Sequence, residues 1–231
     1  MQQKLEGIIL SSTKISDSVR IINIYTNLCG RKSCFLRSSS NKKSKHISNF
    51  IHALSIINFE CDIRINREIS YINEISLNYF YETITINPYK SSIAFFLAEI
   101  IDKTLREEEK NQEMYSFLTS QLVAFDQIKE NISIFHLAFL VKYSKYLGIM
   151  PDIIYSGNNY LDQSQFFTQD QAYLIELFKN LNYNNISEIK ITWQDRIVFL
   201  EKIILYYKIK FDIAEFKTHT ILKEMFTQLS E

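Results

Sequence analysis

The change in hydrophobic periodicity near residue 80 constrains this chain most, because a strand pattern and a helix pattern bury different sets of side chains. Before this point, short runs rich in Ile, Val, Thr, Tyr and Phe alternate with polar turns, as in β-strands. After Pro88, apolar residues recur every three or four positions, as in amphipathic helices. The sequence therefore predicts an α+β fold, with a β-barrel in residues 1–80 and an all-α helical domain in residues 81–231.

Five strands are expected before the change in period, at about residues 5–12, 19–26, 31–37, 56–65 and 68–77. The segment 27–30 predicts a tight turn in which Gly30 takes a positive φ. A short apolar stretch around residues 50–54 is expected to form one or two helical turns. Five strands with one helical interruption favour a small barrel such as an OB-fold.

The second part of the chain predicts a helical bundle. Residues 132–141 are apolar on nearly all sides, which indicates a central buried helix. Gly148 and Pro151 follow in the order that ends a helix. Further amphipathic helices are expected around residues 93–105, 117–125, 174–181, 197–207 and 222–229.

Charge is divided between the two parts. The formal net charge is zero, but residues 1–80 carry 11 Lys/Arg and 6 Asp/Glu, a balance of +5, and the remainder carries −5. Only 4 glycines are present, and none forms the glycine-rich loops that hold nucleotide phosphates. No apolar run approaches the ~20 residues of a membrane span, and the first residues lack a signal-peptide layout. These features predict a soluble, cytoplasmic protein.

Candidate catalytic and metal-binding side chains are few. A structural zinc site needs four closely spaced Cys or His ligands, whereas the chain has only Cys29, Cys34 and Cys61. We interpret these cysteines as small buried hydrophobic residues and not as ligands or nucleophiles. The carboxylates at 107–109 are interpreted as the solvated end of a helix. The sequence therefore predicts no metal, no cofactor and no catalysis.

The strongest functional signal is a basic strand that carries an aromatic residue. Strand alternation places Arg31, Phe35 and Arg37 on one face together with Ser33. Guanidinium groups for phosphates and a ring for a base are what single-stranded nucleic acid requires. Phe35 could equally point into the barrel. The candidate DNA-binding residues are Lys14, Arg20, Arg31, Phe35, Arg37, Lys42, Lys43 and Lys45.

Several segments resemble, in order, the RecO family of bacterial recombination mediators. Residues 7–33 (GIILSSTKISDSVRIINIYTNLCGRKS) resemble the first strands of that family, and residues 37–44 lie where it has a basic loop. The resemblance implies an OB-fold and a helical domain. It also implies a non-catalytic repair protein that binds single- and double-stranded DNA, anneals complementary strands and, with RecR, helps RecA to replace SSB. Further similar segments are residues 91–118, 135–153 and 196–226.

The chain departs from this family at three places. Many members have a four-cysteine zinc module in the region of residues 152–167, where this chain has no cysteine. The family's loop glycine is replaced within residues 38–40. The histidine of a "YYxxH" segment near the end is absent, and Lys208 and Lys210 lie nearby instead. These differences argue against zinc and against proton transfer at those positions.

The resemblance also implies that the helical domain binds the acidic C-terminal tail of SSB. Lysines beside aromatic residues would hold a terminal aromatic side chain and its carboxylate together. The expected residues are Lys202, Tyr206, Lys208 and Lys210, although the aromatic rings could instead be core and the lysines merely solvated. Two other functions stay open: a protein-binding adaptor with the barrel as scaffold, and an RNA-binding accessory subunit of an enzyme.

Overall fold

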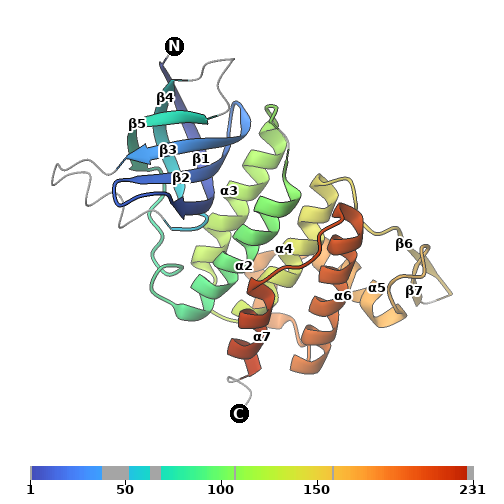
Figure 1. The fold of residues 1–231 in the computed structure, drawn as a ribbon. Helices are drawn as coiled ribbons and strands as arrows, with labels where there is room; N and C mark the ends of the chain where they lie inside the picture. The colour runs from blue at the N-terminus through green and yellow to red at the C-terminus, as the bar shows by residue number, and fades with distance from the viewer. Residues whose placement is uncertain (1, 38–51, 63–68, 107, 158, 228–231) are drawn as a thin grey trace. The chain divides into compact units, whose positions relative to one another are not determined.

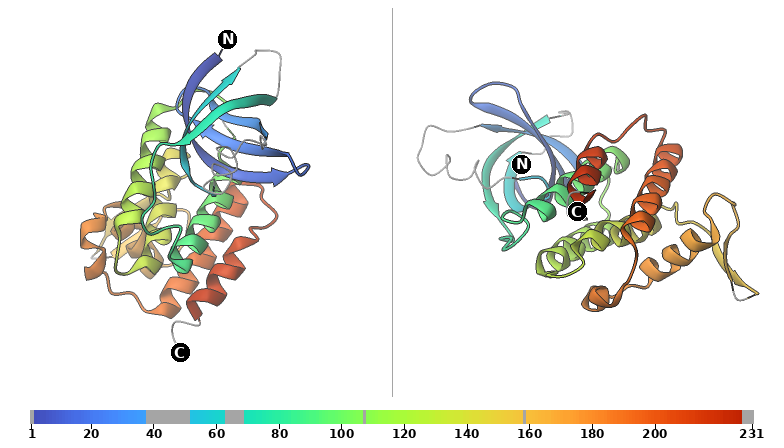
Figure 2. Two further views of the ribbon diagram at one scale, coloured as in Figure 1. Left: turned by 90° about the vertical axis from the view of Figure 1, so that its left-hand side faces the viewer. Right: turned by 90° about the horizontal axis from the view of Figure 1, so that it is seen from below.

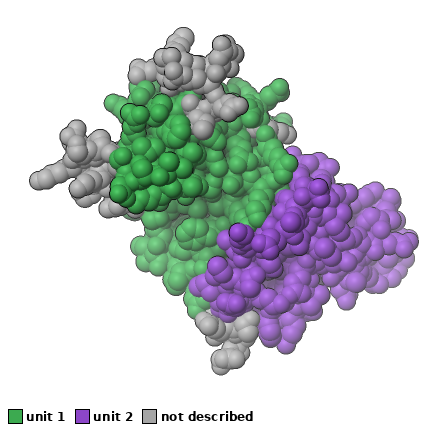
Figure 3. Space-filling model, viewed as in Figure 1, with its two compact units in different colours: residues 1–126 green, residues 127–231 purple. Residues whose placement is uncertain are grey.

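The computed structural model describes residues 2–37, 52–62, 69–106, 108–157 and 159–227. The chain forms two compact units, residues 1–126 and residues 127–231 (Figure 3). The first unit contains two helices as well as the barrel. The boundary between the compact units, after residue 126, therefore differs from the change in hydrophobic periodicity near residue 80. The domain boundary after residue 80 stays a prediction.

The first unit is built on a closed five-stranded barrel with the order β1-β2-β3-β5-β4 (Figure 1). Its neighbouring strands are antiparallel except for β3 and β5, which pair in parallel. This barrel confirms the OB-like fold and five expected strands. The strands are β1 (Gln2–Lys14), β2 (Val19–Thr26), β3 (Gly30–Arg37), β4 (Ile56–Asp62) and β5 (Ile69–Leu77).

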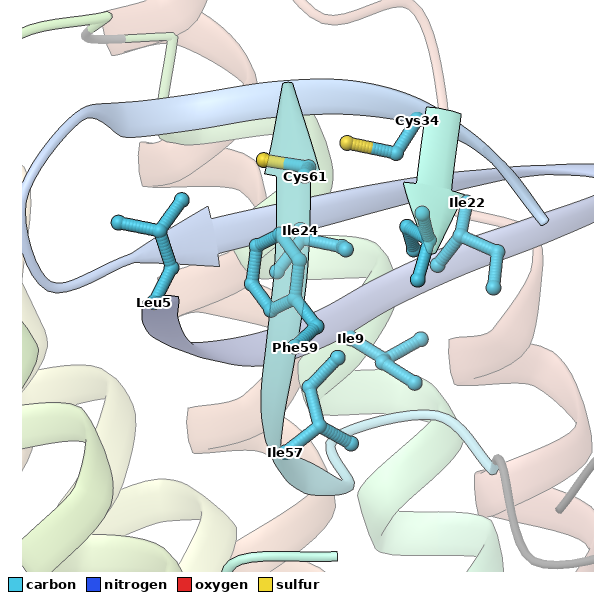
Figure 4. Packing of buried hydrophobic residues seen from close by; sticks show 9 residues of the cluster. Leu5, Ile9, Ile22, Ile24, Cys34, Ile57, Phe59 and Cys61 are labelled. Carbon is cyan, nitrogen blue, oxygen red and sulfur yellow. The ribbon is translucent and has the colours of Figure 1, made fainter. Parts of the chain in front are cut away.

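Alternate residues of the strands fill the barrel interior (Figure 4). Cys34 and Cys61 are 1% and 2% exposed, which confirms that both are packing residues; Cys29 is half-buried. A hydrogen bond with Cys61 and burial both raise the pKa of the Cys34 thiol. Gly30 has φ 61°, as the predicted turn requires. The buried cluster consists of Leu5, Ile9, Ile22, Ile24, Cys34, Ile57, Phe59, Cys61 and Ile72.

Two helices complete the first unit: α2 (Pro88–Thr104) and α3 (Gln112–Gln127). The side chain of Asn87 caps α2 by accepting hydrogen bonds from the N–H groups of Tyr89 and Lys90. Helix α2 packs against β1. Ile8 and Leu10 of β1 point out of the barrel and are nevertheless buried.

The second unit is mainly helical. Helix α4 (Ile132–Tyr146) has ten buried residues, which confirms the predicted central helix. The chain leaves it through Gly148, whose φ is 69°. The other helices are α5 (Gln169–Lys179), the 3-10 helix η1 (Tyr183–Glu188), α6 (Trp193–Phe211) and α7 (Thr218–Thr227).

A short hairpin of β6 (Ile153–Ser156) and β7 (Asn159–Asp162) was not predicted. It lies beside α5 and extends beyond the helices of its unit (Figure 2). It lies within residues 152–167, a region of this chain that contains no cysteine. Of the residues expected to form helical turns, 50–54, residues 50 and 51 lie outside the described residues, and residues 52–54 are not helical but include a turn at 53 and 54. Within the ranges given above, no helix is both long and apolar enough to cross a bilayer.

Candidate nucleic-acid interface

An aromatic pair lies on the outer face of the barrel where β3 and β5 meet. Phe35 and Tyr71 are register partners, and their rings stack with centroids 5.1 Å apart. The guanidinium carbon of Arg37 lies 4.6 Å from the centroid of the Tyr71 ring. Tyr71 is 38% exposed and Phe35 is half-buried. Phe35 therefore points out of the barrel and not into it, because its neighbour Cys34 points inward. We call Phe35, Arg37 and Tyr71 the aromatic platform.

A chain of hydrogen-bonded polar side chains continues this outer face across β1, β2 and β3. The Asn23 amide donates to Ser11 Oγ at 2.8 Å, and the Ser33 hydroxyl donates to Asn23 Oδ1 at 2.7 Å. Ser11, Asn23 and Ser33 are successive register partners. The face therefore offers small polar groups beside the platform, and none of these side chains carries a negative charge that would repel phosphate.

Arg31, although it has the same strand alternation as Phe35, does not join the platform. Its guanidinium donates to the backbone oxygen of Asp102 at 2.7 Å and to Asp102 Oδ1 at 2.7 Å. Asp102 belongs to the last turns of α2, so Arg31 fastens this helix to the barrel. Two of its donors thus already bind a carbonyl and a carboxylate, and its contact with phosphate stays a prediction.

Arg20 and Lys14 also lie apart from the platform, and their contact with DNA stays a prediction. Arg20 has the alternation of Ile22 and Ile24, which point into the barrel, so it does not lie on the face of Phe35. Its Nε is buried and has no hydrogen-bond partner among the described residues. Lys14 is exposed, and its Nζ lies 2.6 Å from Asp17 Oδ1 in the β1–β2 turn. An adjacent carboxylate weakens the attraction of Lys14 for phosphate.

The three loop lysines, Lys42, Lys43 and Lys45, lie outside the described residues, and their role stays a prediction. Tyr71 was missed by the sequence analysis. It comes 36 residues after Phe35 in the printed sequence and reaches it only through the parallel pairing of β3 with β5. An isolated Tyr in a strand pattern carries no local signal of that partner.

The outer face of β1, β4 and β5 has the opposite character. Glu60 and Glu74 are direct register partners there, and Glu6 lies on the same face. Lys4 Nζ lies 3.3 Å from Glu60 Oε1. A hollow of 380 Å³ lies between these side chains. Like charges at opposed positions repel each other, and they also repel phosphate. Substitutions on this acidic face therefore serve as a control in DNA-binding experiments.

A second candidate surface lies on α6. Lys202, Tyr206 and Lys210 are spaced by four residues and share one side of the helix. Lys202 Nζ lies 4.0 Å from the centroid of the Phe166 ring, and Lys210 Nζ lies 5.3 Å from that of Tyr206. The Phe166 and Tyr206 centroids are 5.4 Å apart. We call these four residues the lysine–aromatic patch.

The structure places two of the residues expected at this surface, Tyr206 and Lys208, apart from its exposed side. Tyr206 is only 8% exposed, and its hydroxyl donates to the backbone oxygen of Ile149 at 2.7 Å, so it supports the patch from below. Burial, and then the nearby Asp162 carboxylate, raise the pKa of Tyr206. Lys208 is two residues from Tyr206, about 200° around the helix, and does not share the patch. The half-buried ring of Phe166 is the aromatic surface that sequence reasoning missed.

Among the described side chains, no three or more His, Cys, Asp or Glu residues come together where a metal ion could be held.

The comparisons with known proteins agree over both parts of the chain. The family model "Recombination protein O N terminal" matches residues 1–81, and "Recombination protein O C terminal" matches residues 87–218. A protein of Bacteroides fragilis called DNA repair protein RecO is 30% identical over 241 residues, which cover 98% of this chain and all of that protein. Proteins of the same name from Phocaeicola vulgatus and Flavobacterium johnsoniae are also 30% identical, with the same coverage.

Proposed function

The chain belongs to the RecO family of DNA repair and recombination proteins, and from this premise we propose that it is a non-catalytic recombination mediator. It binds single- and double-stranded DNA and anneals complementary strands. With RecR, it helps to load RecA onto single-stranded DNA that SSB covers. The proposed place of action is the cytoplasm, at the nucleoid.

The aromatic platform is the observation that carries this proposal. Bases of single-stranded DNA stack on exposed rings, and each such contact contributes about 1–3 kcal/mol. Phe35 and Tyr71 offer two adjacent rings, and Arg37 beside them supplies a cation for the phosphate that follows. The β2–β3 side of an OB-fold is also the side on which such barrels bind oligonucleotides.

Single-stranded DNA binding measured by fluorescence anisotropy tests the platform. Tyr71→Ala and Phe35→Ala should each weaken binding about 5- to 100-fold with an unchanged salt slope, because stacking releases no counterions. Arg37→Gln should reduce the log–log salt slope by about 0.7. Tyr155→Ala, which removes a 64% exposed tyrosine from the β6–β7 hairpin, is the matched control. Wild-type affinity of both ring variants would exclude the platform.

The loop lysines are tested separately. Replacing Lys42, Lys43 and Lys45 by Ala should weaken binding for every DNA sequence and lower the salt slope by about 2, because three phosphate contacts are lost. Replacing Glu60 and Glu74 by Gln on the acidic face is the control, and it should not weaken binding. An unchanged triple variant at two salt concentrations would remove the loop from the proposal.

We place the SSB tail on the lysine–aromatic patch. An acidic peptide is attracted by Lys202 and Lys210, and the half-buried Phe166 ring beside Lys202 offers an apolar contact. A fluorescent SSB-tail peptide titrated against the full chain tests this placement. Lys202→Glu with Lys210→Glu should reduce affinity at least tenfold. Lys208→Glu is the matched control on another side of the same helix, and equal losses in both variants would indicate only a general charge effect.

Annealing of complementary oligonucleotides covered by SSB, with and without RecR, tests the mediator role itself. Wild-type protein should accelerate annealing, and the platform variants should not. An adaptor that binds only proteins would keep its activity in variants that lose DNA binding but keep SSB-tail binding. Loss of annealing in such variants would therefore exclude the adaptor alternative.

A further inference from the structure

A groove in the second unit lies between α5 and the start of α6. It has a volume of 570 Å³. Leu174 and Leu177 of α5 line one side, and Ile189, Ile191 and Val198 line the other. Below it, Phe178 and Phe199 close the contact between the two helices, with ring centroids 5.6 Å apart. The groove therefore has apolar side chains from both helices along its length, together with polar and charged residues in its lining.

The groove is lined in part by apolar and aromatic side chains that are exposed to solvent. Tyr173 is 51% exposed and Val198 is 55% exposed, and both line the groove. Scattered exposed apolar residues need no explanation, but a contiguous set in a concave site is typical of an interaction surface. Tyrosine in particular contributes strongly at the centres of interfaces.

The aromatic surface continues from the groove onto the hairpin. The Tyr173 and Tyr160 ring centroids are 5.9 Å apart, and those of Tyr160 and Tyr155 are 5.0 Å apart. Tyr155, at the far end of this row, is 64% exposed. A partner that fills the groove could therefore extend its contacts along three tyrosines.

The rim of the groove is acidic. Asp170, Glu188 and Asp195 line it, with Lys190 as the cation among the lining residues. Asp170 and Glu188 are exposed, and among the residues that the structure describes neither forms a salt bridge. A partner with basic side chains would meet unneutralised carboxylates here, whereas an acidic partner would be repelled.

We propose that the α5–α6 groove binds an amphipathic helix of a partner protein, with its apolar stripe against the leucines and Val198 and with Lys or Arg along its flanks. A trough between two helices takes a third helix through residues spaced at i, i+3, i+4 and i+7. The groove differs in charge from the lysine–aromatic patch, so the second unit separates basic partners from acidic ones. This inference goes beyond the mediator function and does not depend on DNA binding.

Binding of a synthetic peptide to the full chain tests the proposal. The probe is a fluorescein-labelled 18-residue helix of Leu and Lys with one apolar stripe. Two further probes are its Leu/Glu counterpart and a scrambled Leu/Lys peptide that has no stripe. The groove variant is Tyr173→Asp with Val198→Asp, and the rim variant is Asp170→Asn with Glu188→Gln. The matched control is Ile154→Asp, because Ile154 is 40% exposed on the hairpin and outside the groove.

The Leu/Lys helix should bind at least tenfold more tightly than the other two peptides. The groove variant should lose at least tenfold in affinity, the rim variant about threefold, and the control nothing. Circular dichroism and melting curves establish that each variant is folded; if the double substitution unfolds the chain, Tyr173→Lys replaces it. Equal binding of the scrambled peptide, or wild-type affinity of a folded groove variant, would overturn the proposal.

Discussion

Asp126 in the barrel unit and His136 in the helical unit are both buried titratable side chains, and they are kept in opposite charge states. In the barrel unit, Asp126 is 3% exposed, and its carboxylate accepts hydrogen bonds from the N–H groups of Glu82, Thr83 and Ile84 at 2.8, 2.8 and 3.0 Å. Burial acts to raise the pKa of Asp126, but these three bonds and one from the Thr83 hydroxyl hold it below 3.8. The carboxylate is therefore charged.

Lys90 completes this arrangement. It is 1% exposed, and its ammonium group donates to the backbone oxygens of Phe125 and Asp126 at 2.9 and 2.8 Å. Burial lowers the pKa of Lys90, and the Asp126 charge opposes that shift. The pair joins the segment after β5 to both α2 and α3, which explains why these helices form one compact unit with the barrel.

In the helical unit, His136 of α4 is 3% exposed. Burial, and then the positive charge of Arg196, lower the pKa of His136 to about 3. The imidazole is therefore neutral at pH 7. The difference between these two side chains teaches that a buried charge is kept where backbone N–H and C=O groups are turned toward it.

Breaking the Asp126 arrangement should have the largest effect. Asp126→Ala leaves three backbone N–H groups without their partner and removes the negative charge beside the buried Lys90 ammonium group, which keeps its bonds to backbone oxygens. It should lower the free energy of unfolding by about 3–5 kcal/mol. Hydrogen exchange should show the loss in the barrel unit. The fluorescence of Trp193, the one tryptophan of the chain, reports on the helical unit, and Gln127→Ala is the neighbouring control. A stable Asp126→Ala variant would show that the pair is not structural.

The second-largest effect expected is that the two units unfold at different pH in acid. The folded pKa of His136 lies below its ordinary value of 6.5, so its contribution to stability is complete above pH 6.5 and is lost as the pH falls toward 3. The expected loss is about 1.4 kcal/mol per pH unit. Asp126 contributes stability above pH 3.8 and loses it only below that value. Trp193 fluorescence should therefore report unfolding at a higher pH than the barrel signal does.

His136→Gln should remove most of this pH dependence between pH 6.5 and 4, since the variant has no group to protonate. His219→Gln, in α7 of the same unit, is the matched control and should leave it in place. If both variants keep the same acid transition, another group is responsible.

Arg31→Gln should have the smallest effect, and it sharpens the distinction between the two outer surfaces of the barrel unit. It removes the partly exposed ion pair with Asp102 and should cost about 1 kcal/mol of stability. DNA affinity should change less than in Arg37→Gln, because Arg31 donates to α2. A larger loss of DNA binding in Arg31→Gln would return that residue to the interface.

The recognition surfaces show how far sequence reasoning reached. Strand alternation placed Phe35 and Arg37 on one face but did not decide whether that face lies inside the barrel. The sequence grouped Lys202 and Lys210 with Tyr206, but it grouped Lys208 with them as well. Alternation also placed Arg31 on the same face as Phe35 and Arg37. In the structure, Arg31 binds Asp102 of α2. Arg20 was grouped with these residues by its charge, although alternation alone would have placed it with Ile22.

The amino-acid sequence by itself determined where strands end and helices begin, because backbone periodicity is a local property of which side chains can be buried together. It also determined which neighbours along one strand or helix share a face. Only the tertiary structure decided that Tyr71 stacks on Phe35, that Asp102 takes Arg31 and that Phe166 lies under Lys202. Each of these contacts joins residues far apart in the chain, and strand order and helix packing, which local periodicity does not encode, bring them together.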